Sequence, residues 1–220
     1  MERNDDENEE KEPLKIILLG DSGVGKTNII LRYLKNEFNQ NSTSTIGTTF
    51  GVKELNRNNI TYNLNIWDTT GQEMYRSVTK LFIQGSKIVI LVYSIDRKST
   101  FESLNFWCDS INEICGENII LAIVANKMDL FDQGDDGDDD FISEEEGRKF
   151  AEGKKAIFKS VSAKIDKKGI DSLFDQVLDA YIEKKGASVD SSKKDEEKSI
   201  VIKKDQKNNK KGNKKKCCSN

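Results

Sequence analysis

The stretch that decides the fold is Gly20-Asp21-Ser22-Gly23-Val24-Gly25-Lys26-Thr27. It follows Lys15-Ile-Ile-Leu-Leu19, a short apolar run rich in branched residues that predicts a buried strand. We expect a helix directly after it, from about residue 26 to residue 35. A loop of the form G-x-x-x-x-G-K-[ST] between a strand and a helix is typical of phosphate binding. Its glycines turn backbone N–H groups toward anionic oxygens, and the start of the helix adds partial positive charge.

Strand-like and helical segments alternate through residues 13–185. After the first strand, further strands are expected at 50–55, 62–67, 88–94, 119–126 and 156–161. Further helices are expected at about 74–83, 100–115, 143–152 and 169–185. Asn56-Arg57-Asn58-Asn59 favours a turn that joins two strands in an antiparallel hairpin. The sequence therefore predicts an α/β fold: a six-stranded, mostly parallel sheet with one antiparallel edge strand and helices on both faces.

The charge of the chain is distributed unevenly. Its 220 residues carry a net charge of only −3, but residues 1–12 and 132–146 are acidic, whereas the end after Lys193 is rich in lysine. We expect an acidic disordered N-terminus (1–12), one α/β domain (13–185) and a disordered lysine-rich tail (186–220). The longest apolar runs are too short for a membrane span, and the N-terminus does not have the pattern of a secretory signal or transit peptide. This pattern favours synthesis into the cytosol.

The four cysteines fall into two pairs of different character. The sequence has no histidine and no Cys-x-x-Cys, which argues against a zinc site, and a reducing compartment argues against disulfides. Cys108 and Cys115 lie on an expected helix and are interpreted as structural thiols. Cys217 and Cys218 follow three lysines at the end of the chain and are candidates for lipid attachment, with an idle cysteine pair as the alternative.

Two short motifs at expected strand ends indicate which base is bound. Asn126-Lys127-Met128-Asp129 has the N-K-x-D form of guanine-specific GTPases. A carboxylate at this position can accept hydrogen bonds from both the ring N1–H and the exocyclic amine of guanine, and adenine offers no such pair. Ser162-Ala163-Lys164 resembles the companion S-A-K motif that packs against the base.

Two further motifs resemble the switch segments of the Rab branch of the Ras superfamily. They are Trp67-Asp68-Thr69-Thr70-Gly71-Gln72-Glu73 and Thr45-Ile46-Gly47 with Phe50. The resemblance implies that Thr45 and Asp68 bind Mg²⁺, Asp68 through water, and that Lys26 and Thr27 contact phosphate and metal. It also implies that the Gly71 N–H meets the γ-phosphate and that Gln72 orients the attacking water. The remaining residues expected in the first switch are Ser42, Thr43, Ser44, Thr48 and Thr49. Phe38 is interpreted as stacking on guanine, with a buried core position as the alternative.

The resemblance covers roughly residues 14–185 and the double-cysteine ending. It implies a small G-protein fold of the P-loop NTPase class and a GTP-hydrolysing switch that cycles between GTP and GDP with Mg²⁺ and regulates vesicle trafficking. Expected partners are an exchange factor, a GTPase-activating protein, a GDP-dissociation inhibitor, a prenylation escort and effectors. The implied location is the cytoplasmic face of membranes, through two geranylgeranyl groups, with a cytosolic pool and a monomeric core. A lysine-rich tail without aromatic residues does not favour nucleic acid.

The sequence departs from the family in places that leave alternatives open. Thr70 stands where Rab proteins usually have alanine, which predicts slower hydrolysis or a tolerated substitution. A GTP-dependent scaffold that barely hydrolyses is the second hypothesis. A Ras- or Rho-branch switch conflicts with the double-cysteine ending. Residues 132–140 form either a solvated acidic loop or a divalent-cation loop whose spacing fits no EF-hand. Met74 and the segment 81–85 differ from the usual second switch, so the sequence does not identify the effectors.

Overall fold

Apolar, branched residues place three strands in the middle of the sheet. Every residue of β4 (Ile88–Ser94) is buried, as are most of β1 (Leu14–Leu19) and β5 (Ile120–Asn126). The computed structural model describes residues 13–40, 49–69, 81–116, 118–133 and 140–208. Its six strands lie in the order β2-β3-β1-β4-β5-β6, which adds β2 (Thr49–Arg57), β3 (Ile60–Asp68) and β6 (Ile157–Ser160). All neighbouring strands are parallel except β2, so the expected α/β fold is confirmed.

The hairpin of β2 and β3 forms because its turn residues tolerate positive φ. The two-residue loop Asn58-Asn59 has φ of 52° and 62°, the left-handed conformation that a tight primed hairpin turn needs. Asparagine adopts this conformation more readily than most residues. The turn pairs Arg57 with Ile60 and carries β2 along β3 to the edge of the sheet.

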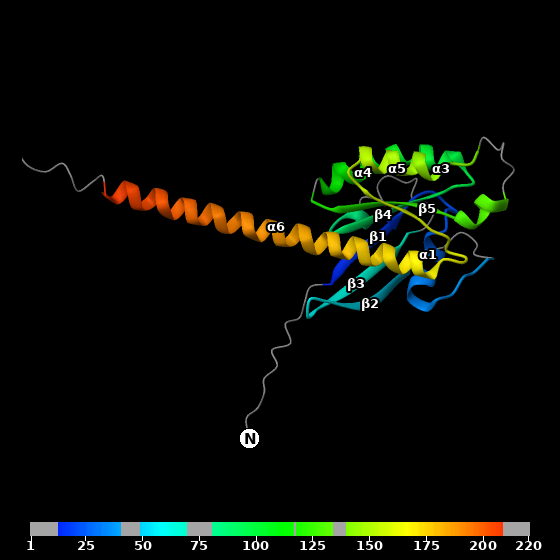
Figure 1. Ribbon diagram of the computed structural model, residues 1–220, viewed down its shortest axis with the longest axis horizontal. Coiled ribbons are helices and arrows are strands. Elements are labelled where there is room, and N and C mark those ends of the chain that lie inside the picture. Colours follow the sequence, from blue (N-terminus) through cyan, green and yellow to red (C-terminus); the bar gives the residue numbers. More distant parts are fainter. Residues whose placement is uncertain (1–12, 41–48, 70–80, 117, 134–139, 209–220) are drawn as a thin grey trace, which may run out of the picture. The chain divides into compact units, whose positions relative to one another are not determined.

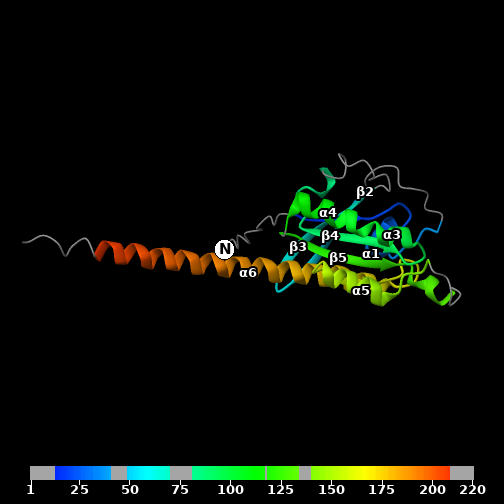
Figure 2. The same cartoon turned by 90° about the horizontal axis from the view of Figure 1, so that it is seen from above.

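Helices cover both faces of the sheet. The α-helices are α1 (Lys26–Lys35), α3 (Lys98–Glu102), α4 (Leu104–Cys115), α5 (Glu144–Gly153) and α6 (Lys167–Asn208), and η1 (Met128–Gln133) is a 3₁₀ helix. Figure 1 shows α3, α4 and α5 on one side and α1 with the first turns of α6 on the other. Seen from above in Figure 2, β4 and β5 are visible between α4 and α5.

Alternating side chains of the central strands fill these two layers. Ile17, Val89 and Ile123 belong to one buried cluster with Trp107 of α4 and Ala151 of α5. On the opposite face, Tyr33 of α1 stacks on Phe174 of α6, with ring centroids 3.7 Å apart and an interplanar angle of 10°. Both layers leave the carboxyl ends of β1, β4, β5 and β6 at one edge, the place where α/β sheets bind ligands.

Two of the expected helices, at 100–115 and at 169–185, differ in the structure. The helix expected at 100–115 is interrupted at Ser103, whose hydroxyl donates to the Ser99 carbonyl over 2.9 Å, a local bond that competes with regular helix geometry. Cys108 is buried and Cys115 partly buried in α4, which agrees with structural thiols. The helix expected at 74–83 lies mostly outside the described residues.

The last helix is the largest departure. We expected it to end at 185 with a disordered tail from Gly186, but α6 continues to Asn208. Residues 186–208 include no proline and six lysines, and lysine has a high helix propensity that needs no buried core. The packing contacts within the chain separate two compact units, residues 1–178 and 179–220, so the part of α6 beyond residue 178 belongs to the second unit. Among the described residues, no helix combines the length and apolarity needed to cross a membrane.

Candidate functional site

The loop between β1 and α1 depends on glycine at two positions. A Cβ on Gly20 would lie 2.0 Å from the carbonyl oxygen of Val92 in β4, so the loop leaves the sheet through a gap that admits no side chain. Gly25 has φ of 96°, and a Cβ there would lie 2.3 Å from Nδ2 of Asn126. The loop can therefore turn back onto α1 only with glycine at both positions.

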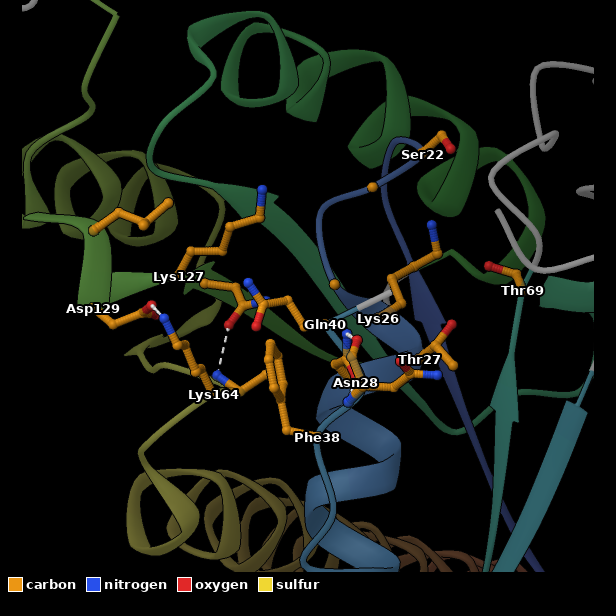
Figure 3. Close-up of a pocket in the computed structure, with 16 residues that line it drawn as sticks. Ser22, Lys26, Thr27, Asn28, Phe38, Gln40, Thr69, Lys127, Asp129 and Lys164 are labelled. Carbon is orange, nitrogen blue, oxygen red and sulfur yellow. Dashed lines mark hydrogen bonds and ion pairs between the residues drawn. The ribbon is translucent and has the colours of Figure 1, made fainter. Parts of the chain in front are cut away.

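A cavity of about 350 Å³ opens over this loop, at the carboxyl ends of the central strands. Figure 3 shows its lining side chains, which come from segments far apart in the sequence. They are Ser22, Gly23, Gly25, Lys26, Thr27, Asn28, Phe38, Asn39, Gln40, Thr69, Asn126, Lys127, Asp129, Leu130, Ala163 and Lys164. Its size suits a ligand of nucleotide dimensions.

One end of the cavity carries a buried cation. Lys26 is only 5% exposed, and its ammonium donates to the carbonyl oxygens of Gly20 over 2.6 Å and of Asp21 over 3.1 Å. The side chain thus bends back over the glycine-rich loop. Together with the N-terminus of α1, it makes this end of the cavity suited to an anion.

A hydroxyl and a carboxylate lie beside Lys26. The Thr27 hydroxyl donates to Oδ2 of Asp68 over 2.7 Å, and Asp68 is 1% exposed. Burial raises the pKa of the Asp68 carboxyl, while the hydrogen bond from Thr27 and the charge of Lys26 act in the opposite direction. Its other oxygen, Oδ1, is buried without a hydrogen-bond partner among the described residues. A buried carboxylate oxygen of this kind beside a hydroxyl fits Mg²⁺, which prefers oxygen ligands.

At the opposite end, Asn126 ties two loops together. Its Nδ2 donates to the Val24 carbonyl over 2.8 Å, and its Oδ1 accepts from the Ala163 N–H over 3.1 Å. Asn126 is fully buried at the end of β5. The glycine-rich loop after β1 and the loop after β6 are therefore held in fixed positions around the cavity.

Asp129 is held in place by the residues of the second short motif. The Ser162 hydroxyl donates to Oδ1 of Asp129 over 2.5 Å. The Lys164 ammonium lies 3.7 Å from Oδ2 of Asp129, an ion pair that Figure 3 shows. The same hydroxyl oxygen accepts from the N–H groups of Lys164 and Ile165, over 3.2 and 3.3 Å. Since Asp129 lines the cavity, its carboxylate is a fixed acceptor for a ligand with two adjacent donors.

Lys127 is restrained by a neighbour that the sequence did not identify. It has φ of 68°, and its ammonium lies 3.2 Å from Asp96 in the turn after β4. Burial alone would raise the pKa of Asp96, but a hydrogen bond from Ser94 and the charge of Lys127 together hold that pKa below its ordinary value. The ion pair directs the Lys127 side chain along the wall of the cavity.

Proteins of one family are similar to this chain over most of its length. The model of the Ras family matches residues 15–183. The chain is 37% identical over 164 residues to Ras-related protein Rab11E of Lotus japonicus, an overlap of 74% of this chain and 72% of that protein. It is 35% identical over 181 residues to Ras-related protein Rab-18 of Caenorhabditis elegans, covering 82% and 85% of the two chains. It is 36% identical over 193 residues to Ras-related protein RABA5c of Arabidopsis thaliana, covering 86% and 87%.

The chain belongs to the Rab family of small GTPases. This Rab protein is therefore a GTPase that binds GTP and acts in the regulation of membrane trafficking. Both statements agree with the expectations from its sequence.

The structure brings eleven of the expected nucleotide-binding residues of this Rab chain to the cavity lining. Three expected residues lie behind the cavity lining: Gly20, Asp68 and Ser162. Each forms a hydrogen bond with a residue that does line the cavity, namely Lys26, Thr27 and Asp129 in that order. Two other loop residues point their side chains elsewhere: Asp21 accepts from Nε1 of Trp107 over 2.9 Å, and Val24 is fully buried. Expected residues outside the described part are Ser42, Thr43, Ser44, Thr45, Ile46, Gly47, Thr48, Gly71, Gln72, Cys217 and Cys218.

Phe38 and its neighbours complete the site. Phe38 is half-buried and lines the cavity, so it is not one of the buried core residues. Sequence reasoning missed Asn28, whose amide donates to the Asn39 carbonyl over 3.1 Å and accepts from its N–H over 2.9 Å. These two hydrogen bonds between the Asn28 side chain and the Asn39 backbone fix the chain just after Phe38. Its place directly after the Lys26-Thr27 pair, at the start of the helix, is the signal that could have identified it.

The last two residues expected in the first switch lie on the edge strand. Phe50 on β2 is 54% exposed, and its ring lies 5.5 Å from the ring of Trp67 on β3. Thr49 is the first residue of the same strand. Thr49 pairs with Asp68 across the hairpin, so both residues lie beside the end of β3 that leads to Thr69 in the cavity lining.

Proposed function

We propose that GTP and GDP occupy this cavity with the base at Asp129 and the phosphates at the loop 22–27. The observation that carries the proposal is that one cavity joins a buried lysine at one end to a fixed carboxylate at the other. Asp129 would accept from N1–H and the exocyclic amine of guanine, while Asn126, Lys127 and Ala163 form the wall around the base. Phe38 would stack on the base from the open side.

The phosphate end would be held by three kinds of group. The ammonium of Lys26 supplies charge for the β- and γ-phosphates, and the backbone N–H groups of the loop supply hydrogen bonds. The hydroxyl of Thr27, the buried carboxylate of Asp68 and, by family resemblance, Thr45 would hold Mg²⁺. When bound, Mg²⁺ neutralises charge on the phosphate oxygens. The orphan oxygen Oδ1 of Asp68 supports this assignment.

Hydrolysis would depend on positioning and electrostatics, because phosphoryl transfer needs little covalent chemistry from the protein. By family resemblance, Gln72 orients the attacking water and the Gly71 N–H meets the γ-phosphate. Among the described residues no arginine lines the cavity, so we expect an intrinsic rate on the order of 10⁻⁴ to 10⁻³ s⁻¹ that an activating protein accelerates. Loss of the γ-phosphate would release residues 39–50 and 69–83 and so end effector binding.

We further propose that the full chain works at the cytoplasmic face of membranes. Cys217 and Cys218 would each carry a geranylgeranyl group, since two chains hold a protein stably where one gives marginal binding. The lysines before them add attraction to an anionic leaflet. An exchange factor, a GDP-dissociation inhibitor and a prenylation escort would complete the cycle. Flotation of the prenylated full-length chain with vesicles, lost in a Cys217→Ser/Cys218→Ser variant, tests this part.

Single-turnover hydrolysis of GTP by the full-length protein with Mg²⁺ tests the switch. A slow, measurable rate that falls in Gln72→Leu, but not in the control Gln176→Leu on the exposed side of α6, is the expected result. Chromatography of the extracted nucleotide should first identify it as guanine. Tight GTP binding with no turnover over many hours would instead favour the scaffold hypothesis and direct attention to Thr70.

A further inference from the structure

The turn after β4 fixes the backbone of an arginine beside the phosphate-binding loop. The Arg97 N–H donates to the Ser94 carbonyl over 3.2 Å, and the Arg97 carbonyl accepts from the N–H of Thr100 over 3.0 Å and from its hydroxyl over 2.8 Å. Arg97 is also the N-cap residue of α3, with φ of −145° and ψ of 96°. The direction in which the Cα–Cβ bond of Arg97 leaves the turn after β4 is therefore fixed.

That side chain reaches the outside of the loop. One terminal nitrogen of the Arg97 guanidinium donates to the carbonyl oxygen of Ser22 over 2.7 Å. A Cβ on Gly23 would lie 3.3 Å from the same nitrogen, so the guanidinium lies against the peptide that joins the two residues. Within the described part of the chain, Arg97 forms no ion pair with a carboxylate, and its full positive charge faces this carbonyl.

The geometry of a peptide bond gives this contact a consequence inside the cavity. The Ser22 carbonyl and the Gly23 N–H belong to one planar trans unit, in which C=O and N–H point in opposite directions. A donor that holds the oxygen from outside therefore holds the N–H toward the opposite side, where Ser22 and Gly23 line the cavity. A charged donor on the oxygen also polarises the N–H and strengthens it as a donor.

The end of strand β5 holds another peptide of the loop by a similar hydrogen bond. Asn126 at the end of β5 donates to the Val24 carbonyl, the oxygen of the peptide that carries the Gly25 N–H. Ser94 at the end of β4 pairs directly with Asn126 across the sheet. Two adjacent strand ends thus hold alternate peptides of the loop, and the one at β4 uses a charged group.

We propose that Arg97 is a positioning residue for the phosphates, which holds the Gly23 N–H toward the bound nucleotide and adds positive charge behind the loop. The proposal rests on the cavity being the nucleotide site. An exposed arginine that bonds to a nearby carbonyl without consequence is the competing interpretation. The two differ in what happens to bound GDP when the guanidinium is removed.

Release of a fluorescent GDP analogue from the full-length protein with Mg²⁺, chased with excess GDP, tests the proposal. Arg97→Ala should release the analogue about threefold to tenfold faster, because a charged hydrogen bond at an exposed site is lost. Arg97→Lys, which keeps a charged donor with less reach, should fall between Arg97→Ala and the wild type. Lys98→Ala removes an exposed cation one residue away and should release at the wild-type rate.

A spectroscopic measurement separates positioning from a merely structural role. In ³¹P spectra of bound GDP, Arg97→Ala should shift the resonance of the β-phosphorus, which the Gly23 N–H would face, more than that of the α-phosphorus. Release rates and β-phosphorus shifts in Arg97→Ala equal to those of the wild type and Lys98→Ala would overturn the proposal. If Arg97→Ala does not fold, Arg97→Lys decides by the same two readouts. A wild-type chain that binds no GDP would overturn the proposed function instead.

Discussion

Removing the hydroxyl of Ser162 should weaken guanine nucleotide binding without changing hydrolysis. This hydroxyl donates to Asp129 over 2.5 Å, and Ser162 is 2% exposed, so water cannot easily replace it in Ser162→Ala. A hydrogen bond to a charged group contributes roughly 1.5 to 3 kcal/mol. Lys164, 3.7 Å from Asp129, still restrains the carboxylate, so we expect a loss of about 2 kcal/mol, or roughly thirtyfold in the Kd for GDP.

The assay is competition of GDP against a fluorescent guanine nucleotide, together with single-turnover hydrolysis of bound GTP. The hydrolysis rate should stay at the wild-type value, because Ser162 lies at the base end and the reacting phosphate at the other. Ser110→Ala is the matched control, since it removes a hydroxyl that bonds only along α4, to the Phe106 carbonyl. An affinity of Ser162→Ala within twofold of Ser110→Ala would refute the assignment of Asp129 as the fixed acceptor for guanine.

Three further predictions concern the metal, the acid stability and the switch. Asp68→Asn should raise the Mg²⁺ concentration needed to retain GDP by about tenfold or more, measured by GDP release across a Mg²⁺ titration. Hydrogen bonds from the side chain and then the backbone of Ser143 lower the pKa of Glu146, so their stabilisation is present at neutral pH and is lost as the pH falls below about 4.5. Thermal unfolding should thus show a shallower acid-induced drop in Tm for Glu146→Gln than for the wild type or Glu145→Gln. Thr70→Ala should hydrolyse GTP faster in single turnover, and an unchanged rate would make Thr70 a tolerated substitution.

Much of the fold follows from local pattern. The apolar run of β4 and the glycine spacing of the phosphate-binding loop each predict their own conformation, because the physical causes lie within a few neighbouring residues. The hairpin turn at Asn58-Asn59 is a further case, since asparagine tolerates the positive φ that the turn needs. Lys26, Asn126 and Asp129 could be predicted as site residues because their motifs occur at strand ends.

The contacts that sequence reasoning missed join residues far apart in the chain. Arg97 and Ser22 are 75 positions apart, and Lys127 and Asp96 are 31 apart, so only the order of β1, β4 and β5 brings them together. Neither Asp96 nor Arg97 belongs to a recognisable motif. The extension of α6 was missed for a different reason. A lysine-rich segment with few apolar residues for a core was expected to be disordered, yet lysine also favours helix.

A crystal structure of the full-length protein with Mg²⁺ and GDP tests the central claim most directly. The account predicts guanine between Phe38 and Lys127 with both of its donors on Asp129. It also predicts the phosphates within the loop 22–27 and Mg²⁺ on the hydroxyl of Thr27. Guanine bound away from Asp129, or phosphates outside the loop, would contradict the assignment of this cavity as the site of the GTPase.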